Sequence, residues 1–270
     1  MLLNLYNLNY LLLALLGGIF TWSITLIGAS TVFLNRGPGR KPFDCMLGFA
    51  GGVMLAASFF SLIVPSIEYS KNLSVPLWFP LSVGFILGSL FLLVLDKVVP
   101  HLHPNAKSSE TEGIKREIPV YFLLILAITI HNIPEGLAVG VSFGSLKYFK
   151  DYENFFAAVS LAFGIGIQDF PEGLAVSMPL ATLGMSKGRS FWYGQLSGIV
   201  EPVFAVIGAL LVSVFSKILP YALSFAAGAM IYVVVEEVIP ETQKAGNTDI
   251  STMSFLFGFL LMMVLDIALP

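Results

Sequence analysis

Two stretches of this chain, HNIPEGLAV at residues 131–139 and QDFPEGLAV at residues 168–176, carry the same motif inside long hydrophobic runs. Six consecutive residues, Pro-Glu-Gly-Leu-Ala-Val, are identical in the two copies, and the residues before them are His, Asn, Gln and Asp. A carboxylate at the centre of a bilayer costs roughly 2.5–3.5 kcal/mol, so acidic residues in a lipid-embedded helix indicate a function. The doubling of the motif favours one site formed between its two copies.

The composition is that of a membrane protein. Hydrophobic residues make up 56% of the 270 residues, and charged residues make up only 11%, whereas soluble domains carry about 25% charged residues. We therefore expect one transmembrane domain that covers residues 1–270. The net charge of -3 and the lack of a basic patch give no reason to expect a nucleic-acid partner. The single cysteine, Cys45, excludes an intrachain disulfide framework.

A helix needs about 20 mostly apolar residues to span a bilayer. Eight segments meet this requirement and predict eight transmembrane helices, at residues 9–34, 43–67, 75–99, 118–141, 155–180, 191–215, 219–240 and 252–270. Ten of the 14 Lys and Arg residues lie in loops after odd-numbered spans, and the other four lie in loops after even-numbered spans. Because short cytoplasmic loops carry an excess of positive charge, we expect the odd-numbered loops in the cytoplasm and both termini outside.

Matching residues relate the first three spans to the last three. Spans 1 and 6 align at an offset of 180 residues, spans 2 and 7 at 176, and spans 3 and 8 at 170. Residues that carry the match include Phe49, Gly52, Phe85, Gly88 and Asp96, which correspond to Phe225, Gly228, Phe255, Gly258 and Asp266. Since the members of each pair are five places apart in the order of the spans, an odd number, the partners cross the membrane in opposite directions.

The predicted fold class is therefore an all-α integral membrane protein, an eight-helix bundle in a 3+2+3 inverted repeat. Spans 1–3 form repeat A, spans 4 and 5 form a central metal-binding pair, and spans 6–8 form the inverted repeat B. Inverted repeats place the substrate site near the bilayer midplane, at the interface of the repeats. The doubled motif lies in spans 4 and 5, where this rule places the site.

His131 and Glu135 are four residues apart and share one helix face, and Gln168 and Glu172 repeat that spacing. Two antiparallel helices that present these faces to each other supply one imidazole, two carboxylates and one amide oxygen. His nitrogen and Asp or Glu oxygen are usual ligands of Zn²⁺. The motif contains no thiolate, which argues against a soft-metal site of the Cu(I) type.

A second set of ligands lies beside the first. Asn132 and Asp169 occupy equivalent motif positions, and Glu201 precedes a proline in the middle of span 6. With Glu135 or Glu172 as a bridge, this set predicts a second cation site. The four acids of both sets, left unpaired, would cost on the order of 10–14 kcal/mol at the value above. Because spans 4, 5 and 6 contain no Lys or Arg, the acids are either protonated or neutralised by a cation.

The prolines of the two motifs fit the same interpretation. Pro134 and Pro171 each remove a helical hydrogen bond and free the carbonyl oxygen four residues earlier. Free carbonyl groups at membrane depth are tolerated where they line a cavity.

Polar residues at the ends of the spans outline a route through the protein. On the cytoplasmic side they predict an exit path, formed by Asp96, His101, His103, Glu236, Glu237 and Glu241. On the outer side Ser58, Ser61 and Glu68 are spaced along span 2 and predict an outer access path. Serine side chains in membrane helices also bond to the backbone, which is the alternative interpretation of this group.

The motifs HNxPEG at 131–136, QDxPEG at 168–173 and the Glu201-Pro202 step resemble those of the ZIP (ZRT/IRT-like protein) family of divalent metal transporters, in particular its GufA-type branch. The resemblance covers all eight spans. It implies a primary site of His131, Glu135, Gln168 and Glu172, and a second site of Asn132, Asp169, Glu172 and Glu201. The two motif glutamates would lie between the sites. Asp96 and the Glu236-Glu237 pair match positions that the family uses toward the cytoplasmic exit.

The resemblance further implies import of Zn²⁺ and related metals toward the cytosol, a homodimer, and movement of spans 1, 4, 5 and 6 against spans 2, 3, 7 and 8. Gln168 stands where many relatives carry His, and Glu236 stands where some carry His. The loop between spans 3 and 4 is shorter than the His-rich loop of many members. These departures bear on metal selectivity and regulation.

The sequence therefore predicts a multi-pass transporter rather than an enzyme, in the plasma membrane or a bacterial inner membrane. Its expected substrate is Zn²⁺, with Fe, Mn and Cd as further substrates, bound at a binuclear midplane site; no catalytic cofactor is expected. One alternative is an intramembrane metal-dependent hydrolase, although the His-Glu-x-x-His signature of zinc proteases is missing. The other alternative is a proton or cation carrier that uses the same acids.

Overall fold

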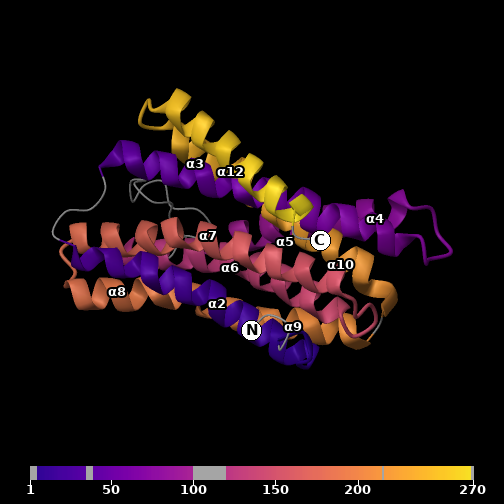
Figure 1. Cartoon of the computed structure of the whole chain (residues 1–270). Coiled ribbons are helices and arrows are strands. Elements are labelled where there is room, and N and C mark those ends of the chain that lie inside the picture. Colours follow the sequence, from indigo (N-terminus) through magenta and orange to yellow (C-terminus); the bar gives the residue numbers. More distant parts are fainter. Residues whose placement is uncertain (1–4, 35–38, 100–119, 215, 269–270) are drawn as a thin grey trace.

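The computed structural model describes residues 5–34, 39–99, 120–214 and 216–268 (Figure 1). Its helices are α2 (Tyr10–Ser30), η1 (Thr31–Phe33), α3 (Arg40–Ala57), η2 (Ser58–Ile63), α4 (Val64–Ser70), α5 (Trp78–Val98), α6 (Val120–Ser145), α7 (Tyr152–Thr182), α8 (Lys187–Leu196), η4 (Ser197–Ile199), α9 (Val200–Val214), η5 (Ser216–Ile218), α10 (Leu219–Val233), η6 (Val234–Val238), α11 (Ile239–Gln243) and α12 (Thr248–Ala268). In the described part of the chain these elements form eight long helical segments, which confirms the predicted number of helices.

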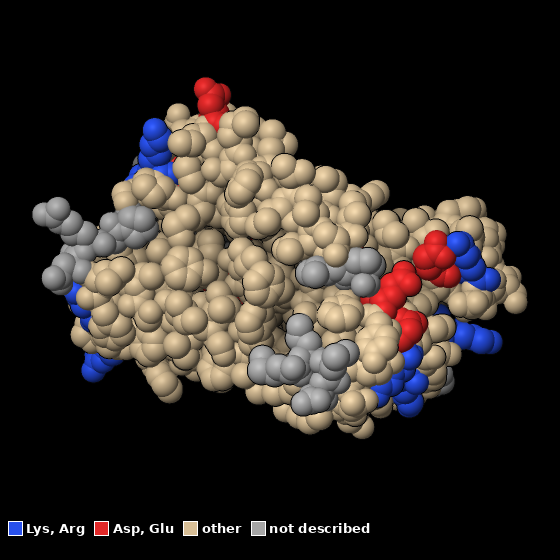
Figure 2. Space-filling view, in the orientation of Figure 1, with Lys and Arg blue, Asp and Glu red and all other residues tan. Residues whose placement is uncertain are grey.

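Six of the eight segments are long and apolar enough to cross a membrane, within the residues that the structure describes. The helices α6 and α7, which carry the two polar motifs, are not among the six. Figure 2 shows charged side chains gathered toward the two ends of the visible face, with a broad band between them that carries none. A band of this kind suits a bundle whose flank is in contact with lipid. The chain is thus an all-helical membrane protein.

The motif helices lie inside the bundle. α6 packs against α9, α2, α7 and α10, and α7 packs against α2, α3, α8 and α6. By contrast, only 22% of the most apolar window of α5 is buried within the protein, and only 17% of that of α12. The outer helices therefore supply the apolar surface, and the helices with the polar motifs are shielded from lipid.

Four close helix contacts form two matched pairs. A Cβ atom on Gly52 would overlap the carbonyl oxygen of Phe255, and one on Gly228 would overlap that of Phe85. In the same way, Gly88 lies against the carbonyl oxygen of Phe225, and Gly258 lies against that of Phe49. In each pair, one contact joins α3 with α12 and the other joins α5 with α10. Only glycine allows backbones to approach so closely, as at small-residue interfaces of membrane helices.

Three of the predicted spans are interrupted rather than continuous. Span 2 contains the π-helical segment η2, span 7 contains the π-helical segment η6, and span 6 contains the 3-10 turn η4. Pro65 and Pro240 are the second residues of the helices that follow the two π segments, and each lacks the N–H that a regular helix would use. The sequence did not predict these irregular turns. Pro134 and Pro171, in contrast, lie inside α6 and α7, which continue through them.

We predict that Gly228→Leu will lower the thermal stability of the purified protein, because the larger side chain has to displace the backbone of α5. Overpacking of this kind costs typically about 1–3 kcal/mol. The measurement is the unfolding temperature in detergent. Gly188→Ala is the control, since nothing lies within 4 Å of a Cβ at that position. Equal unfolding temperatures for the two variants would contradict the close α5–α10 contact.

Candidate metal centre

α6 and α7 bring three buried acids together. Carboxylate oxygens of Glu135, Asp169 and Glu172 all lie within 4.8 Å of one another. Glu135 and Asp169 are fully buried, and Glu172 is 7% exposed. The side-chain amide of Gln168 donates a hydrogen bond of 2.5 Å to Glu135 Oε1, so both motif helices contribute to one polar cluster.

The cluster offers acceptor atoms and few donors. Seven buried oxygens receive no hydrogen bond from the part of the chain that the structure describes; they are Asn132 Oδ1, Glu135 Oε2, Gln168 Oε1, both Asp169 oxygens, Glu172 Oε2 and Glu201 Oε2. Buried polar atoms usually have partners. A set that consists only of carboxylate and amide oxygens lacks positive charge, which a divalent cation supplies. The donor set therefore fits a hard or borderline metal ion.

Glu201 and Asn132 extend the cluster toward α9. Glu201 lies in the first turn of α9 and is fully buried. The Asn132 amide donates to Glu201 Oε1 at 3.2 Å and to the carbonyl oxygen of Ser197 at 3.3 Å. Ser197 begins the turn η4, where the helix is interrupted. Asn132 therefore links α6 to this interruption, and the positive end of the α9 dipole lies next to the Glu201 carboxylate.

His131 lies at the border between this cluster and a second one. Its Nε2 atom contacts Glu237 Oε1 rather than joining the close group of three acids. Glu237 belongs to η6, on the neighbouring segment of the bundle. The imidazole thus connects the motif helix α6 with the acids of η6.

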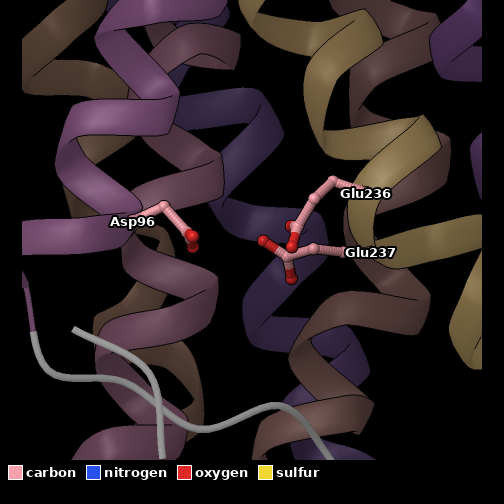
Figure 3. A group of neighbouring side chains, drawn as sticks. All are labelled: Asp96, Glu236 and Glu237. Atoms are coloured by element: carbon pink, nitrogen blue, oxygen red, sulfur yellow. The ribbon is translucent and has the colours of Figure 1, made fainter.

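The second cluster contains Asp96, Glu236 and Glu237. One carboxylate oxygen from each lies within 4.8 Å of the others. Figure 3 shows Asp96 on one helix facing Glu236 and Glu237, which project from another. Asp96 comes from the end of α5, and both glutamates come from η6. The structure therefore brings together three of the residues predicted for the exit path.

A cavity of about 170 Å³ touches both clusters. His131 and Glu172 line it on one side, and Glu236 and Glu237 line it on another. Lys244, whose side chain is 50% exposed, also lines the cavity and marks its connection to the surface. An ion in this cavity would be in contact with groups from both clusters.

The remaining exit residues are placed differently. Glu241 also lines the cavity, but its carboxylate is paired with Arg40 at 2.9 Å and with Lys244 at 3.0 Å. It is not part of the close group of Asp96, Glu236 and Glu237. His101 and His103 lie outside the described residues.

The three residues predicted for the outer access path each have a different partner. Ser58 donates a hydrogen bond to the carbonyl oxygen of Met54, which is the backbone bonding named above as the alternative. Ser61 donates to Asp266 Oδ2 at 2.7 Å. Glu68 is exposed and paired with Lys71 at 2.5 Å. The interpretation of the sequence missed Asp266 as a polar partner, although Asp266 had been aligned with Asp96.

Comparison with known proteins shows which family has this sequence. Residues 101–266 match the family model described as ZIP Zinc transporter. The chain is 40% identical to Zinc transporter ZIP11 of Homo sapiens, over 95% of this chain and 97% of that protein. It is 37% identical to Zinc transporter GufA of Myxococcus xanthus, over 94% of this chain and 98% of that protein. It is also 39% identical to Zinc transporter ZIPB of Bordetella bronchiseptica, over 95% of this chain and 81% of that protein.

The family match covers more than half of the chain, and the likeness to these relatives runs over nearly all of it. It includes both motifs and the acids that they bring together. The chain belongs to the ZIP zinc transporter family.

Proposed function

We propose that this protein imports Zn²⁺ into the cytosol through a binuclear site between α6, α7 and α9. The observation that supports this most directly is the group of carboxylates from Glu135, Asp169 and Glu172, which is buried and rich in unpaired acceptors. The primary site would use His131, Glu135, Gln168 and Glu172. The second would use Asn132, Asp169, Glu172 and Glu201. The chain belongs to a transporter family, which argues against the hydrolase alternative.

The contact of His131 with Glu237 supports a route from the site to the exit cluster. The imidazole is adjacent to the motif acids along α6 and already touches η6. We infer that a metal ion passes from the primary site to Asp96, Glu236 and Glu237 through the shared cavity. Glu241 would act less as a ligand than as a charged group held by Arg40 and Lys244 at the mouth.

We propose that the whole chain is one transporter domain of eight transmembrane helices in a 3+2+3 inverted repeat. The matched glycine contacts support this, because an operation that exchanges span 2 with 7 and span 3 with 8 turns each contact into its partner. The π segments support it as well, since both fall in the paired spans 2 and 7 and precede a proline. The packing of α2 on α7 and of α6 on α9 obeys the same exchange.

The orientation follows from the loop charges. Arg40 and Lys244 lie beside the cavity, at the end of the bundle that the excess of Lys and Arg assigns to the cytoplasm. We therefore infer that the cavity opens inward and that both termini face outside. We further propose that the protein forms a homodimer in a plasma or bacterial inner membrane. We also propose that it transports Fe, Mn and Cd besides Zn²⁺.

We predict that Glu172→Ala will abolish metal uptake, since this carboxylate belongs to both sites and also lines the cavity. The measurement is the initial rate of radioactive zinc uptake into proteoliposomes that contain equal amounts of folded protein. Glu153→Ala is the control, because Glu153 is an exposed acid in the first turn of the same helix. Near-normal uptake by a folded Glu172→Ala protein would refute the assignment of the site.

Glu201→Ala and Asn132→Ala should weaken uptake or change the preference among metals, without abolishing transport. Each removes a ligand of the second site only, so the primary site keeps its four groups. Uptake is compared for Zn²⁺, Cd²⁺ and Mn²⁺ at several concentrations. Complete loss of uptake in either folded variant would show that the second site is as essential for transport as the primary site.

The buried acids Glu135, Asp169, Glu172 and Glu201 would also serve a proton carrier, because none of the ion pairs among the described residues joins them to a basic side chain. The same proteoliposomes, loaded with a pH-sensitive dye, separate the two functions. A metal transporter shows no acidification of the lumen beyond that of empty liposomes when metal is omitted. Acidification without metal, combined with no metal uptake, would favour the carrier.

Single cysteine residues in a Cys45→Ser background test the orientation. Lys71→Cys, in the exposed turn after α4, should react with an impermeant maleimide added to intact cells. Gly188→Cys, at the exposed start of α8, should react only after the membrane is permeabilised. The reverse labelling pattern would show that the proposed direction of the bundle is wrong.

A further inference from the structure

The carboxylate of Glu201 is held on one side only. Oε1 accepts hydrogen bonds from two different helices, from Thr25 Oγ1 of α2 at 3.3 Å and from Asn132 Nδ2 of α6 at 3.2 Å. Oε2 receives none from the described part of the chain. A carboxylate with both donors on one oxygen has a defined orientation and leaves its other oxygen available.

The hydroxyl of Thr25 has one hydrogen and two acceptors within reach. The alternative to Glu201 is the carbonyl oxygen of Thr21 at 3.5 Å, one helical turn earlier. A carboxylate is both nearer and the stronger acceptor, because hydrogen bonds to ionised groups are shorter and stronger than neutral ones. Thr25 therefore donates to Glu201 when that group is charged.

Two glycines make room for this contact. A Cβ on Gly198, in the turn η4, would lie 2.8 Å from Glu201 Oε1 and 2.9 Å from Thr25 Oγ1. A Cβ on Gly173, the residue after Glu172, would overlap the carbonyl oxygen of Thr25. Thr25 is thus seated between the motif of α7 and the start of α9, and it is fully buried.

We propose that Thr25 is a positioning residue for the second cation site. Together with Asn132 it fixes Glu201 Oε1, so that Oε2 is presented to the cation next to Asp169. Asp169 belongs to the close group of acids with Glu135 and Glu172, and neither Asp169 oxygen accepts a hydrogen bond among the described residues. Thr21, one turn earlier on α2, is also buried, but its hydroxyl donates to the Gly18 carbonyl oxygen at 3.0 Å.

This inference rests on the proposed function, because it assigns a role toward a metal ion at the second site. It adds to the second site a residue that orients a ligand, from α2, a helix whose sequence carries no acid. A residue that orients a ligand changes the affinity for the ion more than the rate of the conformational change. The expected signature is therefore a change in KM and in metal preference with little change in kcat.

The test compares Thr25→Val with Thr25→Ser in the full-length protein in proteoliposomes. Valine keeps the shape of threonine but cannot donate, whereas serine keeps the hydroxyl. We expect Thr25→Val to raise the KM for Zn²⁺ roughly tenfold, which is typical for the loss of a hydrogen bond to a charged group, and to alter the ratio of Zn²⁺ to Mn²⁺ uptake. Thr25→Ser should stay close to the unmodified protein.

Thr31→Val is the matched control, since Thr31 lies in η1 directly after α2 and its hydroxyl bonds only to the Gly28 carbonyl among the interactions described. Thr25→Ala serves in place of the valine variant should that variant fail to fold, as judged by its unfolding temperature in detergent. A Glu201→Ala background adds a further check. There, Thr25→Val should cause no additional change, because the group on which it acts is gone.

Unmodified KM and metal preference in folded Thr25→Val would overturn the inference. Equal impairment of Thr25→Ser and Thr25→Val would also overturn it, because the effect would then come from packing. An additive effect in the Glu201→Ala background would count against it in the same way. If the unmodified protein takes up no metal at all, the proposed function fails instead, and the two failures are thereby distinguished.

Discussion

Mutual repulsion among the buried carboxyl groups of α6 and α7 is the constraint on which the rest of the site depends. Glu135, Asp169 and Glu172 offer oxygens within 4.8 Å of one another. At that separation two unit charges repel by roughly 3 kcal/mol or more at an effective dielectric constant of about 20. No Lys or Arg of the described chain is paired with them, so a bound cation or bound protons must supply the missing positive charge. The lack of positive charge explains why the site consists of oxygen ligands. It also explains why the site needs a cavity through which a cation can enter.

The surrounding helices meet that constraint by holding the acids in place without neutralising them. Gln168 donates to Glu135, and Thr25 and Asn132 donate to one oxygen of Glu201. In each case the donor is a neutral amide or hydroxyl, which orients a carboxylate but leaves its charge. A Lys or Arg at the same place would compete with the metal ion for the carboxylate. A carboxylate that was already neutralised by the protein would have little affinity for a metal ion.

The close helix contacts explain how such a charged centre is carried by a stable bundle. Helices in lipid associate by close packing rather than by burial of apolar surface from water. The glycines at 52, 88, 228 and 258 let α3 and α5 meet α12 and α10 backbone to backbone. The motif helices are held in the same way: a Cβ on Gly140 of α6 would overlap the carbonyl oxygen of Ala205, and one on Gly173 of α7 would overlap that of Thr25. Close backbone contacts thus fix α6 on α9 and α7 on α2, while the ligands project from other faces of the same two helices.

The sequence by itself determined the number and approximate bounds of the helices, because a run of about 20 apolar residues has few alternatives in a chain so poor in charge. It also determined that the acids of the doubled motif would meet, because each motif puts polar groups on a single helix face that lipid cannot accommodate. Only the tertiary structure decided which ligands meet which. His131 lies against Glu237, Glu241 is paired with Arg40 and Lys244, and Ser61 is paired with Asp266. The π segments, the break before Glu201 and the contact of Thr25 with Glu201 were likewise decided there. The physical reason is that spacing along one helix defines a face, whereas a partner on another helix depends on how the backbones approach and on where the hydrogen-bond pattern is interrupted.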